Sequence, residues 1–89
     1  MPTATTVVTV HQVDGWHARP ATEFARIVGE FGLAVTIGRA GEEAVRGDSV
    51  LSLMTLGARQ NEQLTIVVNF EATDEANAQQ LIEALHELF

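Results

Sequence analysis

Along this chain, segments with the hydrophobic pattern of strands alternate with segments that have the pattern of helices, and this order restricts the fold most strongly. Segments that are rich in β-branched residues, or that alternate between apolar and polar positions, predict strands over residues 5–11, 33–38, 43–46 and 63–70. Apolar residues spaced three and four apart predict amphipathic helices over residues 18–29, 50–56 and 74–89. The expected order is strand, helix, strand, strand, helix, strand, helix.

This order predicts an α+β fold with two layers, because helices gathered on one face of a mostly antiparallel sheet bury the apolar side of both layers. With 89 residues the chain can build only a small core. No linker, repeat or low-complexity segment divides it. We therefore expect residues 1–89 to form a single domain.

Glycines and small polar residues set the expected ends of the helices. Gly29 and Gly32 are expected to end the first helix, because glycine is common just after a helix. Asp48 or Ser49 is expected to cap the start of the second helix, and Thr73 the start of the third.

Several classes of protein and site are disfavoured by composition. The chain has no cysteine, which excludes disulfides and thiolate metal sites, and His11, His17 and His86 are too scattered to suggest a metal site. The first residues do not resemble a signal peptide, and no apolar run approaches the roughly 18 residues of a membrane span. We expect a soluble cytoplasmic protein with no metal or cofactor and no membrane insertion.

The chain is acidic, with a formal charge of −7, five arginines and no lysine. Nucleic-acid binding needs a basic surface that meets phosphates, so we expect no nucleic-acid partner. If the protein handles phosphate, one of the few arginines must lie where the phosphate binds.

One segment is more informative about chemistry than the rest, and it joins the first strand to the first helix: Gly15-Trp16-His17-Ala18-Arg19-Pro20-Ala21. Gly15 permits an unusual backbone turn. Pro20 is tolerated in the first turn of a helix, where its missing N–H loses no bond. His17 is therefore expected at the N-cap position or next to it.

A histidine at this position is suited to binding and transferring an anion. The positive end of the helix dipole disfavours imidazolium, so His17 should be largely neutral and nucleophilic near pH 7. The free N–H groups of Ala18 and Arg19 would cradle a phosphoryl group, and the guanidinium of Arg19 suits phosphate oxygens. A histidine beside a tryptophan is more often structural, so these residues alone leave both interpretations open.

Two blocks of sequence together resemble the HPr family, the histidine-containing phosphocarriers of the bacterial phosphoenolpyruvate-dependent sugar phosphotransferase system. The block around His17 resembles the phosphohistidine signature of that family. The second block resembles the segment around the family's regulatory serine, and reads Asp48-Ser49-Val50-Leu51-Ser52-Leu53-Met54-Thr55-Leu56-Gly57. The spacing of the blocks and the order of elements also match, so the resemblance covers essentially the whole chain.

The resemblance implies an open-faced β-sandwich, a four-stranded, mainly antiparallel sheet with three helices on one face (βαββαβα). It implies a phosphocarrier, not a stand-alone enzyme, that accepts a phosphoryl group from phosphorylated enzyme I and donates it to IIA domains of sugar permeases. The family's phosphohistidine maps onto His17, with phosphate on Nδ1, and its active-site arginine onto Arg19. Its regulatory serine maps onto Ser49, which in many Gram-positive relatives is phosphorylated by the ATP-dependent HPr kinase.

We also expect a small docking surface for transient partners beside His17. Its expected members are an apolar patch with two arginines at the rim, namely Ala18, Val50, Leu51, Met54, Arg19 and Arg26. Leu53 and Leu56 are expected to cover the sheet instead.

Three positions depart from the family's usual pattern. Trp16 stands where leucine is more usual, and we expect little change from it. Gly29 stands where a basic residue is frequent, which thins the positive rim. Asp48 precedes Ser49 where a basic residue is common, so a phosphate on Ser49 would meet a like charge. We therefore expect Ser49 to be a poor kinase site.

Two alternatives to the sugar-system phosphocarrier stay open at this point. One is a paralogue with the same chemistry in a nitrogen-related phosphorelay. The other is a small regulatory or ligand-binding module without covalent chemistry, which the placement of His17 and Arg19 disfavours. A monomer is the expected state for a carrier that must expose one site to several partners.

Overall fold

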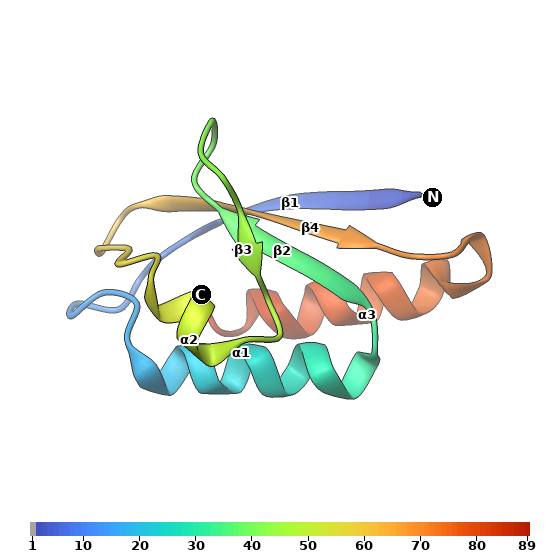
Figure 1. The fold of residues 1–89 in the computed structure, drawn as a ribbon, viewed down its shortest axis with the longest axis horizontal. Coiled ribbons are helices and arrows are strands. Elements are labelled where there is room, and N and C mark those ends of the chain that lie inside the picture. Colours follow the sequence, from blue (N-terminus) through green and yellow to red (C-terminus); the bar gives the residue numbers. More distant parts are fainter. Residues whose placement is uncertain (1) are drawn as a thin grey trace.

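The computed structural model of the protein describes residues 2–89 and contains four strands, three α-helices and one 3₁₀ turn (Figure 1). The elements in chain order are β1 (Thr3–Thr9), α1 (Ala18–Phe31), β2 (Ala34–Gly38), β3 (Val45–Arg46), α2 (Val50–Met54), β4 (Gln63–Asn69), η1 (Ala72–Asp74) and α3 (Glu75–His86).

The strands form one antiparallel sheet in the order β1-β4-β2-β3. The helices lie together on one side of this sheet, and the opposite face of the sheet is open (Figure 1). The predicted α+β class and the open-faced sandwich are therefore confirmed.

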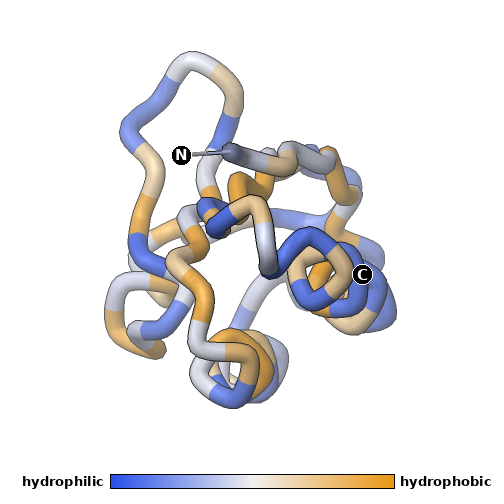
Figure 2. Tube along the Cα trace, turned by 90° about the vertical axis from the view of Figure 1, so that its right-hand side faces the viewer, coloured by the Kyte–Doolittle hydropathy of each residue, from blue (hydrophilic) through white to orange (hydrophobic). Residues whose placement is uncertain are grey.

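The core lies between the sheet and the helices. Strand β4 alternates strictly, so that Leu64, Ile66 and Val68 are all buried against the helical layer. Phe24 of α1 and Leu81 of α3 are fully buried opposite them. Each such side chain contributes about 1.5–3 kcal/mol by leaving water. Figure 2 shows hydrophobic and hydrophilic residues interspersed along the helices, as expected for elements with one buried side.

Helix α1 runs past the first of its two expected stop signals. Gly29 lies inside the helix, on its exposed side, so the expectation that it helps to end α1 is wrong. Glycine in an exposed helix position costs only about 1 kcal/mol, which tertiary packing of the other face outweighs. Gly32 ends the helix as predicted, with φ of 69° and its N–H donating to the Val28 carbonyl oxygen at 3.1 Å.

The starts of the other two helices differ in how they are capped. Ser49 caps α2, because its side chain accepts from the backbone N–H of Ser52 at 3.2 Å. The predicted cap at Thr73 is wrong, because Thr73 lies within η1 and α3 begins at Glu75. A backbone bond closes this turn, with the N–H of Asp74 donating to the Glu71 carbonyl oxygen at 2.8 Å, so no side-chain cap starts α3. Within residues 2–89 no helix is long and apolar enough to cross a membrane.

Candidate functional site

His17 is the N-cap residue of α1, with an extended backbone (φ −127°, ψ −170°) and no side-chain capping bond. Its carbonyl oxygen accepts the first helical bond from the N–H of Ala21 at 3.2 Å. The N–H groups of Ala18 and Arg19 lie in the first turn, where a helix offers them no acceptor. Together with the helix dipole, they make this end of α1 suited to an anion.

The loop before His17 is fixed by a close approach to residues 57–59. The N–H of Trp16 donates to the Ala58 carbonyl oxygen at 2.8 Å. Gly15 has φ of 76°, and a Cβ atom at this position would lie only 2.6 Å from that same oxygen. Glycine is therefore the residue that both the backbone conformation and the available space require.

The side chain of Trp16 anchors this loop in the core. It is only 5% exposed and meets the ring of Phe24 edge-on, with 5.8 Å between centroids and 83° between planes. On the same loop, Nε2 of Gln12 donates to the Leu88 carbonyl oxygen at 2.8 Å. The loop that carries His17 is thus attached to α1 and to the segment after α3.

The imidazole of His17 has a carboxylate neighbour. Nε2 of His17 lies 3.4 Å from Oδ2 of Asp14, and both side chains are accessible, with 41% and 74% exposure. A carboxylate next to Nε2 favours the neutral tautomer that carries its proton there, which leaves the lone pair on Nδ1. Asp14 is not among the site residues expected from the sequence, although its place three residues before an N-cap histidine is a signal that could indicate it.

Arg19 is exposed on the first turn of α1, in a shallow recess that Asp14 and His17 also line. Within residues 2–89 its guanidinium makes no ion pair. Its charge is therefore available to an anion at the start of the helix.

Arg26, the second expected rim residue, is exposed but compensated. Its guanidinium pairs with Glu23 at 2.9 Å and with Glu30 at 2.8 Å, both on the same helix. The hydrogen bond from Arg26 lowers the pKa of the Glu23 carboxyl, which keeps that partner ionised. Arg26 therefore adds little net positive charge to this face.

The apolar residues of α2 and of the turn after it divide between core and surface. Leu53 and Leu56 are buried, which confirms that part of the prediction. Leu51 is 82% and Met54 45% exposed, whereas Val50 is partly buried against the core. Val13, on the His17 loop, is a further exposed apolar residue at 84%, and it is not among the docking residues expected from the sequence.

Ser49 uses its side-chain oxygen as the cap of α2, and the acid beside it is paired. Arg46 donates twice to the Asp48 carboxylate, at 3.0 and 2.8 Å. These hydrogen bonds lower the pKa of Asp48. The repulsion expected between Asp48 and a phosphate on Ser49 is therefore reduced by a neighbour two residues earlier in the chain.

Comparison with known proteins agrees with this geometry. The family described as "PTS HPr component phosphorylation site" matches residues 4–89. The chain belongs to the HPr family.

The similarity extends over almost the whole chain. The phosphocarrier protein HPr of Streptomyces coelicolor is 34% identical over 84 residues, which are 91% of this chain and 90% of that relative. The HPr of Pseudomonas aeruginosa is 34% identical over 83 residues, 92% of this chain and 90% of that protein. The crystal structure of HPr from Bacillus anthracis superposes with a TM-score of 0.80 at 26% identity, covering 97% and 95% of the two chains. HPr proteins are phosphocarriers of the phosphotransferase system.

Proposed function

We propose that this chain accepts a phosphoryl group on Nδ1 of His17 from phosphorylated enzyme I and donates it to IIA domains of sugar permeases. The observation that carries this proposal is the placement of His17 at the N-cap of α1, with Nε2 beside Asp14. Because Asp14 lies beside Nε2, the lone pair of Nδ1 is the one left for attack, on a residue that immediately precedes the first-turn N–H groups.

The groups that the proposed transfer uses are Nδ1 of His17, the first-turn N–H groups and the Arg19 guanidinium. The lone pair of Nδ1 attacks the phosphorus atom, an N–P bond forms, and the bond from phosphorus to the donor's nitrogen breaks. The first-turn N–H groups of Ala18 and Arg19 stabilise the transferred oxygens, and the guanidinium of Arg19 adds charge-assisted bonds. Donation to the next protein is the reverse sequence with a different acceptor nitrogen.

The partner proteins would dock around His17. Our proposed docking surface consists of Ala18, Val50, Leu51, Met54 and Arg26. In this proposal Ser49 is a poor site for an HPr kinase/phosphorylase, because its side-chain oxygen caps α2. Exposed apolar side chains of this kind suit brief encounters with several partners better than a permanent interface. The proposal assigns residues 1–89 to one domain that acts as a cytoplasmic monomer.

The test is incubation with enzyme I and phosphoenolpyruvate, followed by intact-mass measurement. We expect one acid-labile phosphoryl group on the wild-type protein and none on His17→Ala. His11→Ala is the matched control, since His11 is an exposed residue near the same loop, and it should be phosphorylated normally. An unmodified wild-type protein in the presence of a competent enzyme I would rule the proposal out.

A further inference from the structure

Two of the five arginines differ from the others in their electrostatic surroundings. Arg26, Arg39 and Arg46 each have a carboxylate partner within 3.0 Å. Arg19 and Arg59 have no ion pair with any residue in the range 2–89. In a chain with a net charge of −7, these two guanidinium groups are where an anionic surface can approach.

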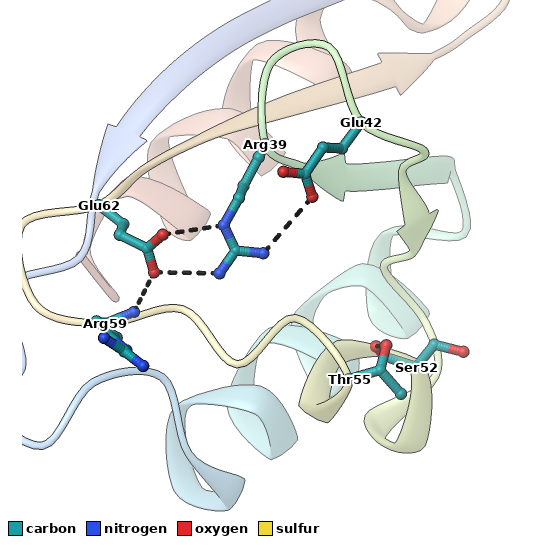
Figure 3. A network of polar contacts seen from close by, with 6 residues as sticks. All are labelled: Arg39, Glu42, Ser52, Thr55, Arg59 and Glu62. Atoms are coloured by element: carbon teal, nitrogen blue, oxygen red, sulfur yellow. Dashed lines mark hydrogen bonds and ion pairs between the residues drawn. The ribbon is translucent and has the colours of Figure 1, made fainter.

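Arg59 packs against the loop that leads to His17, whereas Arg19 lies on the first turn of α1. A Cβ atom on Gly15 would be 3.3 Å from Cα of Arg59, so the two backbones are in contact. Arg59 also lines a surface recess together with Val13, Asp14 and Trp16. In Figure 3 its side chain extends toward the loop that leads into α1, away from the Glu62 carboxylate.

The backbone of Arg59 is held in place although its side chain is free. The N–H of Arg59 donates to the Glu62 carboxylate (Figure 3). That carboxylate is itself fixed by Arg39, through hydrogen bonds of 2.9 and 3.1 Å. A charged side chain on a fixed backbone loses less entropy on binding than one on a mobile loop.

The cations at this end of the molecule are therefore arranged differently from what the sequence suggested. Gly29 contributes no charge to the α1 rim, and Arg26 is compensated by its two glutamates. Within residues 2–89 the guanidinium groups without an ion pair are instead those of Arg19, on the first turn of α1, and Arg59, against the loop before His17. The exposed Val13 lies in the same recess as Arg59 and offers an apolar contact next to it.

We propose that Arg59 is a docking residue that binds a carboxylate on the acidic surface of the protein that delivers the phosphoryl group to His17. This proposal rests on the proposed function. The transferred group is itself anionic, and carboxylates on the donor surface around it would meet positive charge at Arg19 in the first turn of α1 and at Arg59 against the loop before His17. Such contacts act mainly on the encounter between the proteins and not on the chemical step.

The experiment is steady-state phosphorylation by enzyme I and phosphoenolpyruvate, with wild type, Arg59→Gln and Arg59→Lys. We expect Arg59→Gln to raise the KM for this protein about threefold to fivefold, because a rim ion pair contributes up to about that factor. The kcat should stay within about twofold, and Arg59→Lys should retain most of the wild-type KM. The difference between wild type and Arg59→Gln should vanish at about 0.5 M salt, where the Debye length is only a few Å.

A matched control separates docking from net charge. Gln80→Glu makes the same change of one charge on an exposed position of α3, and its KM should equal that of wild type. An Arg59→Gln variant that melts like wild type and keeps the wild-type KM at low salt would overturn the docking role. With that result, normal phosphorylation of His17 would still support the proposed function. A wild-type protein that enzyme I does not phosphorylate would instead contradict the proposed function.

Discussion

The indole ring of Trp16 lies parallel to the phenyl ring of Phe89, with 3° between their planes and 5.0 Å between their centroids. Phe89 also meets Phe24 edge-on, at 6.3 Å and 86°, so three rings from distant parts of the sequence form one cluster. Because Trp16 immediately precedes His17, this cluster determines where the backbone of the histidine lies.

Replacing Phe89 should therefore destabilise the protein. We expect Phe89→Ala to lower the free energy of unfolding by about 2–3 kcal/mol, somewhat less than for a fully buried phenylalanine, because Phe89 is only partly buried. Urea denaturation followed by circular dichroism measures the change. Leu51→Ala is the control, since Leu51 is 82% exposed and should shift stability by less than about 0.5 kcal/mol. Equal stabilities for the two variants would contradict a structural role for the ring cluster.

Removing the carboxylate beside His17 should change the tautomer of its ring. In the wild-type protein, neutral His17 should carry its proton on Nε2, where Oδ2 of Asp14 lies 3.4 Å away. In Asp14→Ala we expect a mixture of both tautomers and phosphoryl acceptance slowed about tenfold, a typical loss when the partner that orients a histidine is removed. Nitrogen-15 chemical shifts of the imidazole report the tautomer directly. His11 serves as the internal reference, and identical His17 shifts in both proteins would argue against this role for Asp14.

Two glycine substitutions should have opposite effects on stability. Gly15→Ala places a Cβ atom 2.6 Å from the Ala58 carbonyl oxygen at a φ of 76°, so we expect a loss of at least about 2 kcal/mol. Gly29→Ala meets no atom within 4 Å on an exposed helix position, so we expect a gain of about 0.5–1 kcal/mol. Thermal melts of the two variants give the comparison. A stabilised Gly15→Ala protein would mean that the loop can relax away from residue 58.

The Glu62 carboxylate should make stability depend on pH in the acid range. Hydrogen bonds from Arg39, and then from the backbone of Arg59, lower its pKa from 4.5 to about 2. A carboxyl whose pKa is lower in the folded state stabilises the protein above its unfolded pKa. That contribution is lost as pH falls from about 4.5 toward 2.

Thermal melts between pH 5 and pH 2 measure this effect. We expect Glu62→Gln to be less stable than wild type at pH 5. As the pH falls, its melting temperature should decrease less than that of wild type. Glu43→Gln is the control, because Glu43 is exposed and makes no ion pair within residues 2–89. If the melting temperatures of wild type and Glu62→Gln fell in parallel with pH, the carboxylate network of Figure 3 would not contribute to the pH dependence of stability.

The parts of this site that the sequence predicts are those that depend on neighbouring residues. Pro20 in the first turn and Gly15 before the histidine are enough to place His17 at the N-cap, and Ser49 is recognisable as a cap. The resemblance of the two sequence blocks then indicates the family. The helix end expected at Gly29 and the cap expected at Thr73 are exceptions. Helix α1 continues past Gly29 to Phe31, and a backbone turn at Asp74 replaces the side-chain cap.

The parts that the sequence does not predict depend on distant residues or on side-chain direction. Trp16 looked like a conservative replacement, yet its partner Phe89 is 73 positions away and lies next to it only in the folded chain. Arg26 looked like a free cation until its two glutamates were seen on the same helix face. Arg59 carries no motif, and its position against the loop before His17 follows from the contact between Gly15 and residues 58 and 59.

The attachment of the His17 loop to residues 88 and 89 also bears on the order in which the protein is made. The ribosome synthesises residue 17 long before residue 88, so during translation the indole of Trp16 has no stacking partner and Gln12 has no acceptor at Leu88. Contacts of such long sequence separation form late in folding. A nascent chain that does not yet include residues 88 and 89 thus carries the histidine without these contacts to its loop.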